Sequence, residues 1–464
     1  GVSSDVIFKN GNDISTNKLA PVFNYTDGEK TSFTITNKST TSFSYRILLN
    51  ITSIDNELKN KTLKYKLVSN NTIITEGDFS NIESNSKNTL YEGKLSKGNV
   101  DFIFYLYING NEENDLNMIN KSLVGKIIVE EKPTLAKKIT DLYTKAAKTT
   151  TTVNSVTYNL APSEGLMNDR KGSMSTGIDA GNIRYYGANP NNYIYFNCSD
   201  YSNQSSDTCE TWRIIGVFDG KVKIMRGSQI GTYSWDTSDS STNSGYGVNE
   251  WSQADLMKLL NSGYETESVG GSLYWNAQSG TCYNGSKNAT GSCNFTSTGL
   301  KNDTTRNLIA ETTYYTRGHN DSKIYVNAMY DKERVSGTVI TGVTPTRTLT
   351  WIGKVAIPYP SDYGYAADLS LCQKQLGSYN DATCTANNWM KNIITNNGGN
   401  YGWLLTPYSG LAYGAWFVYS SGYVYGNGSY ASHAGGVAPV LSLSSELGIV
   451  AGTGTSSDPY QLYV

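Results

Sequence analysis

The residues best suited to chemistry in this chain lie in one uncharged segment near the C terminus. The 54 residues between Lys391 and Glu446 carry no charged side chain, although charged residues make up 17% of the chain. Composition alone would place about nine charges there. Tyrosine, serine, glycine and asparagine dominate instead, as in antibody binding sites, where tyrosine gives rigid contact area and small polar residues give adaptable hydrogen bonds. The expected chemistry is ligand binding, and the alternative is a low-complexity tail.

The flanking pattern favours an ordered surface over a tail. Tyr401–Pro407 and Gly436–Leu443 are short apolar runs that predict buried strands. Between them, apolar and aromatic positions alternate with the period of two that is typical of a strand hairpin, and the turn is expected at Ser420–Gly422. The alternating residues are Trp416, Val418 and Val424 on one face and Phe417, Tyr419, Tyr423 and Tyr425 on the other.

The outward positions of this hairpin and its loops form the candidate contact set. For each tyrosine in this set, the alternative is an ordinary solvent-exposed strand residue that contacts no ligand. His433 is expected to be a further contact or a surface residue, since a lone histidine without partners is neither a metal site nor a catalytic base. We expect no catalytic residue, metal or cofactor. The set comprises Tyr408, Leu411, Tyr413, Phe417, Tyr419, Tyr423, Tyr425, Asn427, Ser429, Tyr430, Ser432 and His433.

Six cysteines fall into three close pairs, and their spacing favours sequential disulfides. Each bridge would close a loop of about a dozen residues and contribute about 2–3 kcal/mol. Zinc sites usually combine closely spaced cysteines with histidines, and the chain has only two histidines. Free structural thiols remain the alternative. Disulfides predict an extracellular or cell-surface protein. The expected pairs are Cys198 with Cys209, Cys282 with Cys293, and Cys372 with Cys384.

Length and composition predict a mostly β chain of two or three domains. A net charge of −2 and a pI of about 5.9 argue against nucleic acid as a partner. No segment is apolar enough to span a bilayer, so a membrane is expected only through an anchor that these residues do not contain. Strand-like runs over 1–132 predict an immunoglobulin-like β-sandwich. An amphipathic helix and a linker are expected over 133–176, and an α+β domain over 177–464.

Residues from about 180 to 464 resemble a known family in several motifs. These are Asn191–Cys198, Trp212–Gly216, Gly271–Trp275, Tyr359–Ala366, Trp403–Pro407, Ala415–Trp416 and Gly436–Leu441. They resemble the bacterial and phage surface proteins with a C-type lectin fold that diversity-generating retroelements diversify. This fold is shared with the formylglycine-generating enzymes. The resemblance implies a C-type lectin fold with a variable region at about 404–441. Ala438 departs from the family pattern, which usually has arginine at that position.

The resemblance implies a non-enzymatic, surface-displayed receptor or adhesin whose hypervariable face binds a protein or glycan ligand. An alternative is a structural fibre or pilus-like adhesin subunit that polymerises through the N-terminal sandwich, which resembles the secreted camelysin/TasA fibre proteins. A third reading is an oxidase like the formylglycine-generating enzymes. Those enzymes use a copper-binding cysteine pair near the C terminus, and this chain has no cysteine after Cys384.

Overall fold

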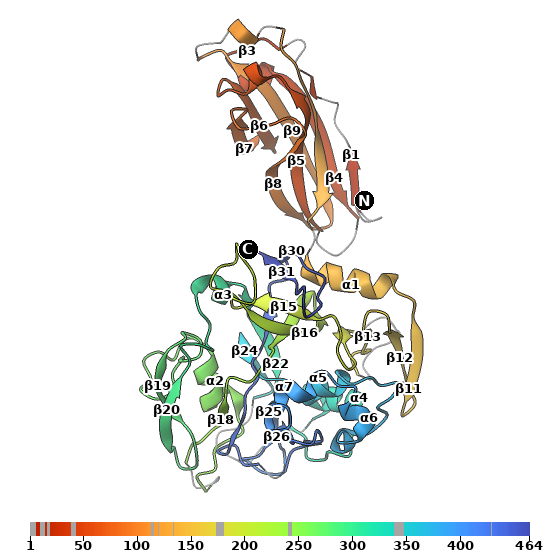
Figure 1. Cartoon of the computed structure of the whole chain (residues 1–464), viewed down its shortest axis with the longest axis vertical. Coiled ribbons are helices and arrows are strands. Elements are labelled where there is room, and N and C mark those ends of the chain that lie inside the picture. The colour runs from red at the N-terminus through yellow and green to blue at the C-terminus, as the bar shows by residue number, and fades with distance from the viewer. Residues whose placement is uncertain are drawn as a thin grey trace. The chain divides into compact units, whose positions relative to one another are not determined.

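The chain forms two compact units, residues 1–133 and 134–464, in a computed structural model (Figure 1). The structure describes residues 6–9, 14–15, 19–38, 43–112, 116–118, 120–132, 134–172, 181–239, 244–337, 348–427 and 429–464. The domain boundary expected at residues 176 and 177 lies outside these ranges. The mostly β class predicted from the sequence is confirmed.

The first unit is a sandwich of two β-sheets. One sheet has the order β1-β4-β9-β6-β7, with β3 beside β9, and the other has the order β2-β10-β5-β8. The strands are β1 (Val6–Lys9), β2 (Ile14–Ser15), β3 (Pro21–Val22), β4 (Glu29–Asn37), β5 (Phe43–Ile54), β6 (Leu63–Ser69), β7 (Thr72–Asp78), β8 (Ser86–Leu95), β9 (Gly98–Asn109) and β10 (Leu123–Glu131).

Alternating side chains of the two sheets fill the core of this sandwich. Phe33 of β4 lies opposite Phe102 of β9, and their rings stack 5.2 Å apart. Ile47 and Leu49 of β5 face them from the other sheet and are fully buried. Like immunoglobulin domains, this unit packs two β-sheets face to face. Consecutive strands such as β4 and β5 lie in different sheets.

The second unit begins with the expected helix. Thr134 caps α1 (Leu135–Lys145) by accepting a hydrogen bond from the Lys137 amide, and Leu135, Ile139 and Tyr143 are buried. The following residues, which we expected to be a linker, form strands of the largest sheet instead. That sheet has the order β11-β12-β13-β14-β16-β17-β29-β21, with β15 beside β16 and β24 beside β29.

The elements of the second unit are β11 (Thr149–Val153), β12 (Val156–Ala161), β13 (Leu166–Asn168), β14 (Ile183–Tyr185), β15 (Tyr193–Phe196), β16 (Glu210–Phe218), β17 (Lys221–Arg226), β18 (Thr232–Ser234), α2 (Asp255–Leu260), β19 (Ser279–Tyr283), β20 (Thr290–Asn294), α3 (Asp303–Asn307), β21 (Ile309–Ala310), β22 (Thr312–Tyr315), α4 (Val326–Asp331), β23 (Thr350–Gly353), β24 (Val355–Ala356), α5 (Pro360–Tyr365), α6 (Ala382–Thr385), α7 (Lys391–Ile394), β25 (Gly402–Pro407), β26 (Ala415–Val418), β27 (Val424–Tyr425), β28 (Ala434–Gly436), β29 (Val440–Leu443), β30 (Gly448–Ala451) and β31 (Gln461–Tyr463).

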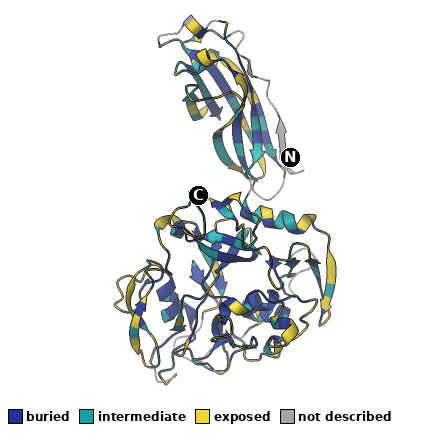
Figure 2. Cartoon of the chain, in the orientation of Figure 1, coloured by how far each residue is buried: buried dark blue, intermediate teal, exposed yellow. Residues whose placement is uncertain are grey.

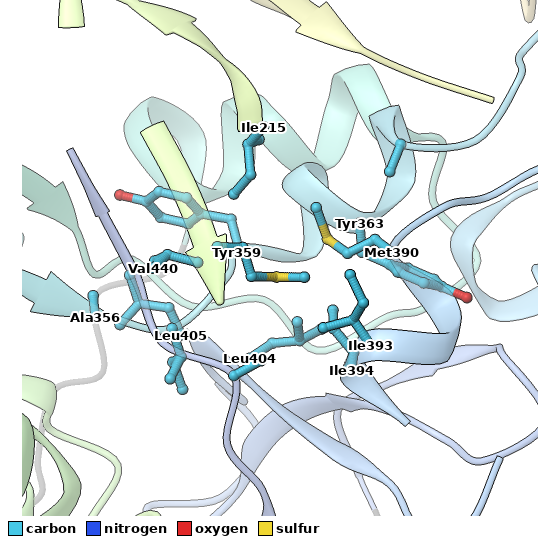
Figure 3. Close-up of a cluster of buried hydrophobic side chains, with 14 of the residues drawn as sticks. Ile215, Ala356, Tyr359, Tyr363, Met390, Ile393, Ile394, Leu404, Leu405 and Val440 are labelled. Atoms are coloured by element: carbon cyan, nitrogen blue, oxygen red, sulfur yellow. The ribbon is translucent and has the colours of Figure 1, made fainter. Parts of the chain in front are cut away.

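A five-stranded sheet in this unit carries the uncharged segment. Its order is β18-β28-β25-β26-β27, and β25 is the central strand, with every residue buried. Leu404 and Leu405 of β25 lie in an apolar core with Met390, Ile394 and Tyr363 (Figure 3). The central strand of this sheet is therefore fixed by packing against the apolar core. Colouring by burial shows that exposure also differs between strands, since β11 carries mostly exposed residues whereas β16 is largely buried (Figure 2).

Three disulfides join the cysteines in the expected sequential pairs. Cys198 is bonded to Cys209, Cys282 to Cys293, and Cys372 to Cys384. The second bridge links the two strands of the β19–β20 hairpin. Among the residues that the structure describes, no helix has both the length and the apolar character that a bilayer crossing requires.

Candidate functional site

The predicted hairpin is present as β26 and β27. Phe417 pairs with Tyr425 and Val418 pairs with Val424 in antiparallel register. The turn closes through hydrogen bonds from the Tyr419 amide to the Tyr423 carbonyl (2.9 Å) and from the Gly422 amide to the Tyr419 carbonyl (2.8 Å). The turn thus contains Ser420–Gly422, as the alternating pattern predicted, and the backbone here is regular.

A buried residue from a distant element holds the tip of the turn. Tyr363 of α5 is fully buried, and its hydroxyl donates a 2.6 Å hydrogen bond to the carbonyl of Gly422. Gly422 itself has φ +108°, a conformation that a side chain disfavours. Sequence reasoning placed this turn correctly but had no signal for its anchor, because the two residues lie 59 positions apart.

Three tyrosines on and beside the turn form a ring cluster at the surface, which we call the hairpin cluster. Tyr419 and Tyr423 stack 4.9 Å apart, and Tyr425 meets Tyr423 edge-on at 6.2 Å. Tyr419 is 43% exposed and Tyr425 is 38% exposed, while Tyr423 is half-buried. Burial and then the neighbouring Tyr419 and Tyr425 raise the pKa of Tyr423. Its phenol is a hydrogen-bond donor and acceptor.

Phe417 differs from its expected place in the contact set. It lies directly opposite Tyr425, as the register requires, but only 3% of it is exposed. The rings of Tyr401 at 5.4 Å, Trp403 at 6.5 Å and Tyr425 at 6.1 Å surround it. Side chains that lie opposite each other on paired strands pack together, and here the neighbouring rings cover Phe417. Phe417 therefore supports Tyr425 from below rather than offering a contact surface of its own.

A second group of rings, the loop cluster, joins two loops of the segment. Tyr430 lies 5.0 Å from Tyr413 and 5.2 Å from His433, measured between ring centroids. Tyr246, from outside the segment, packs against Tyr430 at 4.5 Å and Tyr413 at 5.5 Å. Tyr413 and Tyr430 are half-buried and His433 is exposed. The structure thus brings these three predicted residues together and adds a fourth ring.

Asn249 fixes the backbone beneath the loop cluster. Its side-chain amide lies within donating distance of the carbonyls of Tyr408 (3.0 Å), Leu411 (2.8 Å) and Gly414 (2.7 Å). Its backbone amide donates to the carbonyl of Ala412 (2.8 Å). Asn249 is 1% exposed, so these bonds are shielded from water. The loop at 408–414 takes its shape from a residue about 160 positions upstream.

The remaining predicted residues divide between surface and interior. Asn427 is exposed, and Tyr408 and Leu411 are half-buried. Ser429 is 7% exposed and Ser432 is fully buried, which differs from the outward placement that we expected for both. The Ser432 carbonyl accepts a 2.6 Å hydrogen bond from the Ser234 hydroxyl, so Ser432 connects β18 to the loop before β28. Small polar residues in this segment thus serve the fold as well as the surface.

Sequence reasoning missed Tyr246. It lies between Gly245 and Gly247, which have φ +80° and +88°. Glycines in this conformation form tight turns that present the residue between them, and the sequence Gly-Tyr-Gly was a readable signal of this. The sequence does not indicate which residues this turn meets, because Tyr246 lies more than 160 positions before Tyr413 and Tyr430.

Within the described residues, no group of three or more histidine, cysteine, aspartate or glutamate side chains is placed to hold a metal ion. What the two clusters offer is a set of aromatic faces and phenol hydroxyls on backbone that is fixed by buried hydrogen bonds. This arrangement suits contact with a ligand through stacking and directed hydrogen bonds.

Comparisons with known proteins assign neither a family nor a function to the chain. No family model matches it, and no curated protein matches it. Among solved structures, a family 35 carbohydrate-binding module from an environmental isolate is 16% identical, with a TM-score of 0.17, over 27% of this chain and 88% of that one. The GH26-CBM35 β-(1,4)-mannanase of Podospora anserina is 13% identical, with a TM-score of 0.17, over 31% of this chain and 36% of that one. A ruminal GH26 endo-β-1,4-mannanase is 13% identical, with a TM-score of 0.15, over 30% and 34%.

Proposed function

We propose that the second unit is a non-enzymatic binding domain whose uncharged tyrosine face binds a protein or glycan ligand. The observation that carries this proposal is the exposure of Tyr419 and Tyr425 on a hairpin whose strand residues Trp416, Val418 and Val424 are buried. A ring held on fixed backbone loses little conformational entropy when a ligand covers it. Tyrosine is also enriched among the residues that dominate binding energy at interfaces.

We further propose that this face is hypervariable and displayed outside the cell, as the resemblance to retroelement-diversified proteins implies. The anchors of the face support the first part, since Asn249 and Tyr363 lie outside the variable region of about 404–441. Side chains on the face are therefore free to change without altering the groups that fix its backbone. The three disulfides support the second part, because disulfides persist in oxidising compartments.

Binding is tested with the full chain on a glycan array and on a panel of immobilised extracellular proteins. The variant Tyr419→Ala/Tyr423→Ala/Tyr425→Ala should lose at least tenfold in affinity for any ligand found, while its unfolding midpoint stays close to that of the parent. Tyr463→Ala is the matched control, because Tyr463 is also 43% exposed but lies outside the face. If the triple variant bound the ligand as tightly as the parent, the tyrosine face would not be the binding site.

Hypervariability is tested on the DNA around the coding segment for residues 401–441. The proposal expects a near-identical repeat that differs at adenines, close to a reverse transcriptase gene. Sibling copies of the protein should differ at Tyr413 and Tyr425 and agree at Trp403 and Trp416. Copies identical at the exposed tyrosines would contradict diversification and leave the binding proposal standing by itself.

A further inference from the structure

A pocket of about 680 Å³ opens in the second unit at a place that the tyrosine face does not use. Its wall is formed by β17, β22 and α4 and the residues after α4. None of its lining residues comes from the segment 401–436. A pocket of this size holds a ligand of about disaccharide size. Among the described residues, its wall combines aromatic rings with four cationic side chains, Lys171, Lys221, Lys223 and Arg334.

Two of these cationic residues, Lys223 and Arg334, form ion pairs with carboxylates that lie behind them. Lys223 Nζ is 2.7 Å from Asp362 Oδ2, and Arg334 Nη1 is 2.6 Å from Glu333 Oε1. Asp362 and Glu333 have no exposed side-chain surface and do not line the pocket, whereas Lys223 and Arg334 do. A ligand in the pocket therefore faces the positive ends of both ion pairs.

Aromatic rings hold these cations in place. The Arg334 guanidinium lies 3.8 Å from the ring centroid of Tyr330 and 4.3 Å from that of Tyr359. Lys223 Nζ is 4.6 Å from the centroid of Tyr359. Arg334 belongs to a π-helical turn, Lys332–Ser336, and such turns are frequent at functional sites. Both donors are thus positioned before any ligand arrives.

A second cavity of about 600 Å³ lies beside the pocket. Lys171, Asn182 and Asp219 line both spaces. Among the residues that the structure describes, the two cavities are lined by five cationic side chains and two acidic ones, although the whole chain has a net charge of −2. The cationic residues are Lys148, Lys171, Lys221, Lys223 and Arg334, and the acidic ones are Asp219 and Glu311. The local excess of positive charge favours an anionic ligand long enough to pass from one cavity to the other.

The polar and apolar groups of the pocket narrow the choice of ligand. Thr312, Thr313 and Ser442 line it with hydroxyl groups, which suit a ligand rich in hydroxyls. Ile352 lines it as well and is 64% exposed, so an apolar surface lies uncovered beside the charged wall. An uncharged, apolar ligand would gain nothing from the positive ends of the two ion pairs that face the pocket.

We propose that this pair of cavities binds an acidic saccharide, with a carboxylate against Lys223 and Arg334 and sugar rings against the tyrosines. The site is separate from the tyrosine face, so the chain carries two binding sites of opposite character. One is an exposed uncharged surface, and the other is a recessed cationic pocket.

The probe is digalacturonic acid, titrated into the full chain and followed by calorimetry, with maltose as the uncharged disaccharide. We expect digalacturonic acid to bind at least tenfold more tightly than maltose and to weaken as salt is raised. Lys221→Gln should lower its affinity threefold to tenfold, because Lys221 lines the pocket without belonging to the buried ion pairs. Lys374→Gln, at an exposed lysine that does not line the pocket, should leave it unchanged.

A second variant tests the donors themselves. Arg334→Lys keeps the charge but removes the planar fork, and it should weaken binding more than Lys221→Gln does. A triglutamate peptide is the competing anion, and binding of that peptide at equal or higher affinity would overturn the assignment to a saccharide. Equal affinity for maltose, or equal losses in Lys221→Gln and Lys374→Gln, would overturn the cationic pocket as the site.

Discussion

The hydroxyl of Tyr363 donates a hydrogen bond to the carbonyl oxygen of Gly422, and so a buried helix residue holds the tip of an exposed hairpin. The partners belong to elements that the chain places far apart, and the bond is hidden from water because both residues are buried. A turn held in this way keeps its rings in one arrangement before a ligand arrives. That fixed arrangement is what the proposed binding face requires.

Replacing Tyr363 by phenylalanine should loosen the hairpin. The change leaves the buried Gly422 carbonyl without its donor, which costs about 1–3 kcal/mol. Urea unfolding followed by tryptophan fluorescence measures this in the second unit alone, because all eight tryptophans lie there. Hydrogen exchange of the Tyr419 and Gly422 amides should speed up. Tyr365→Phe is the control, since Tyr365 is also fully buried and donates to the Asp169 carbonyl, and it should destabilise the unit without affecting those amides.

Gly422→Ala should destabilise the second unit by about 1–3 kcal/mol. The glycine has φ +108°, and an added Cβ would lie 2.8 Å from Cγ2 of Thr385. The matched control is Gly291→Ala in β20, where an added Cβ would meet no atom within 4 Å and φ is ordinary. Urea midpoints of the two variants test the prediction, which fails if both shift by the same amount.

Asn249→Asp should disturb the loop cluster selectively. The side-chain amide faces three carbonyl oxygens, and a carboxylate in its place would set acceptor against acceptor. We expect a loss of about 2 kcal/mol or more. The aromatic NMR signals of Tyr413 and Tyr430 should broaden or shift. Asn261→Asp provides the comparison, because Asn261 also donates to two buried carbonyls but lies outside the face. Unchanged signals in Asn249→Asp would contradict the role given to Asn249.

Acidification from pH 8 to pH 5 should stabilise the second unit. Burial and then the charge of Asp236 raise the pKa of Asp255 to about 7, with Lys258 opposing the shift. The folded state therefore binds this proton more tightly than the unfolded state, whose pKa is near 3.8. The resulting stability is complete below pH 3.8 and is lost as the pH rises through about 7. Burial also raises the pKa of Asp236, which acts in the same direction.

The melting temperature of the second unit, read from tryptophan fluorescence, measures this effect. It should rise by about 2 °C or more between pH 8 and pH 5. Asp255→Asn should flatten the dependence, since an amide oxygen can still accept from the Thr237 amide and hydroxyl. Asp362 does not obscure the result. Although burial opposes it, the charges of Lys223 and Arg184 lower the pKa of Asp362 to about 2, outside the window. If the melting temperature of Asp255→Asn depended on pH as that of the parent does, Asp255 would not be the group responsible.

The sequence predicted strands best where one face is buried. Phe43–Ile51 and Val100–Ile108 alternate clearly, and both lie within long central strands. β7 and β8 were missed, because edge strands expose both faces for much of their length and lack an apolar period. The sequence Asp303–Thr312 predicts a helix with an N-cap at its start. The helix α3 ends at Asn307, because Ile309 pairs with Leu443 in the large sheet instead.

The sequence predicted the hairpin of the candidate site, but it did not predict which of the rings are exposed. Alternation assigns Phe417 and Tyr425 to one face, and that assignment holds. It cannot say which ring covers the other, since that depends on Tyr401 and Trp403 in the neighbouring strand. The glycines around Tyr246 indicate a turn but not its partner, and Asn249 has no local signal, because both residues reach the segment only through the tertiary fold. Their contribution appears only in three dimensions.

The hydrogen bonds of Asn249 also bear on protein engineering. Because the carbonyls that this amide holds belong to the backbone, they are present whatever side chains residues 408–414 carry. A foreign loop of equal length should therefore adopt the same path when grafted here. The second unit is therefore suited to use as a disulfide-bonded scaffold in which the loop 408–414 is exchanged.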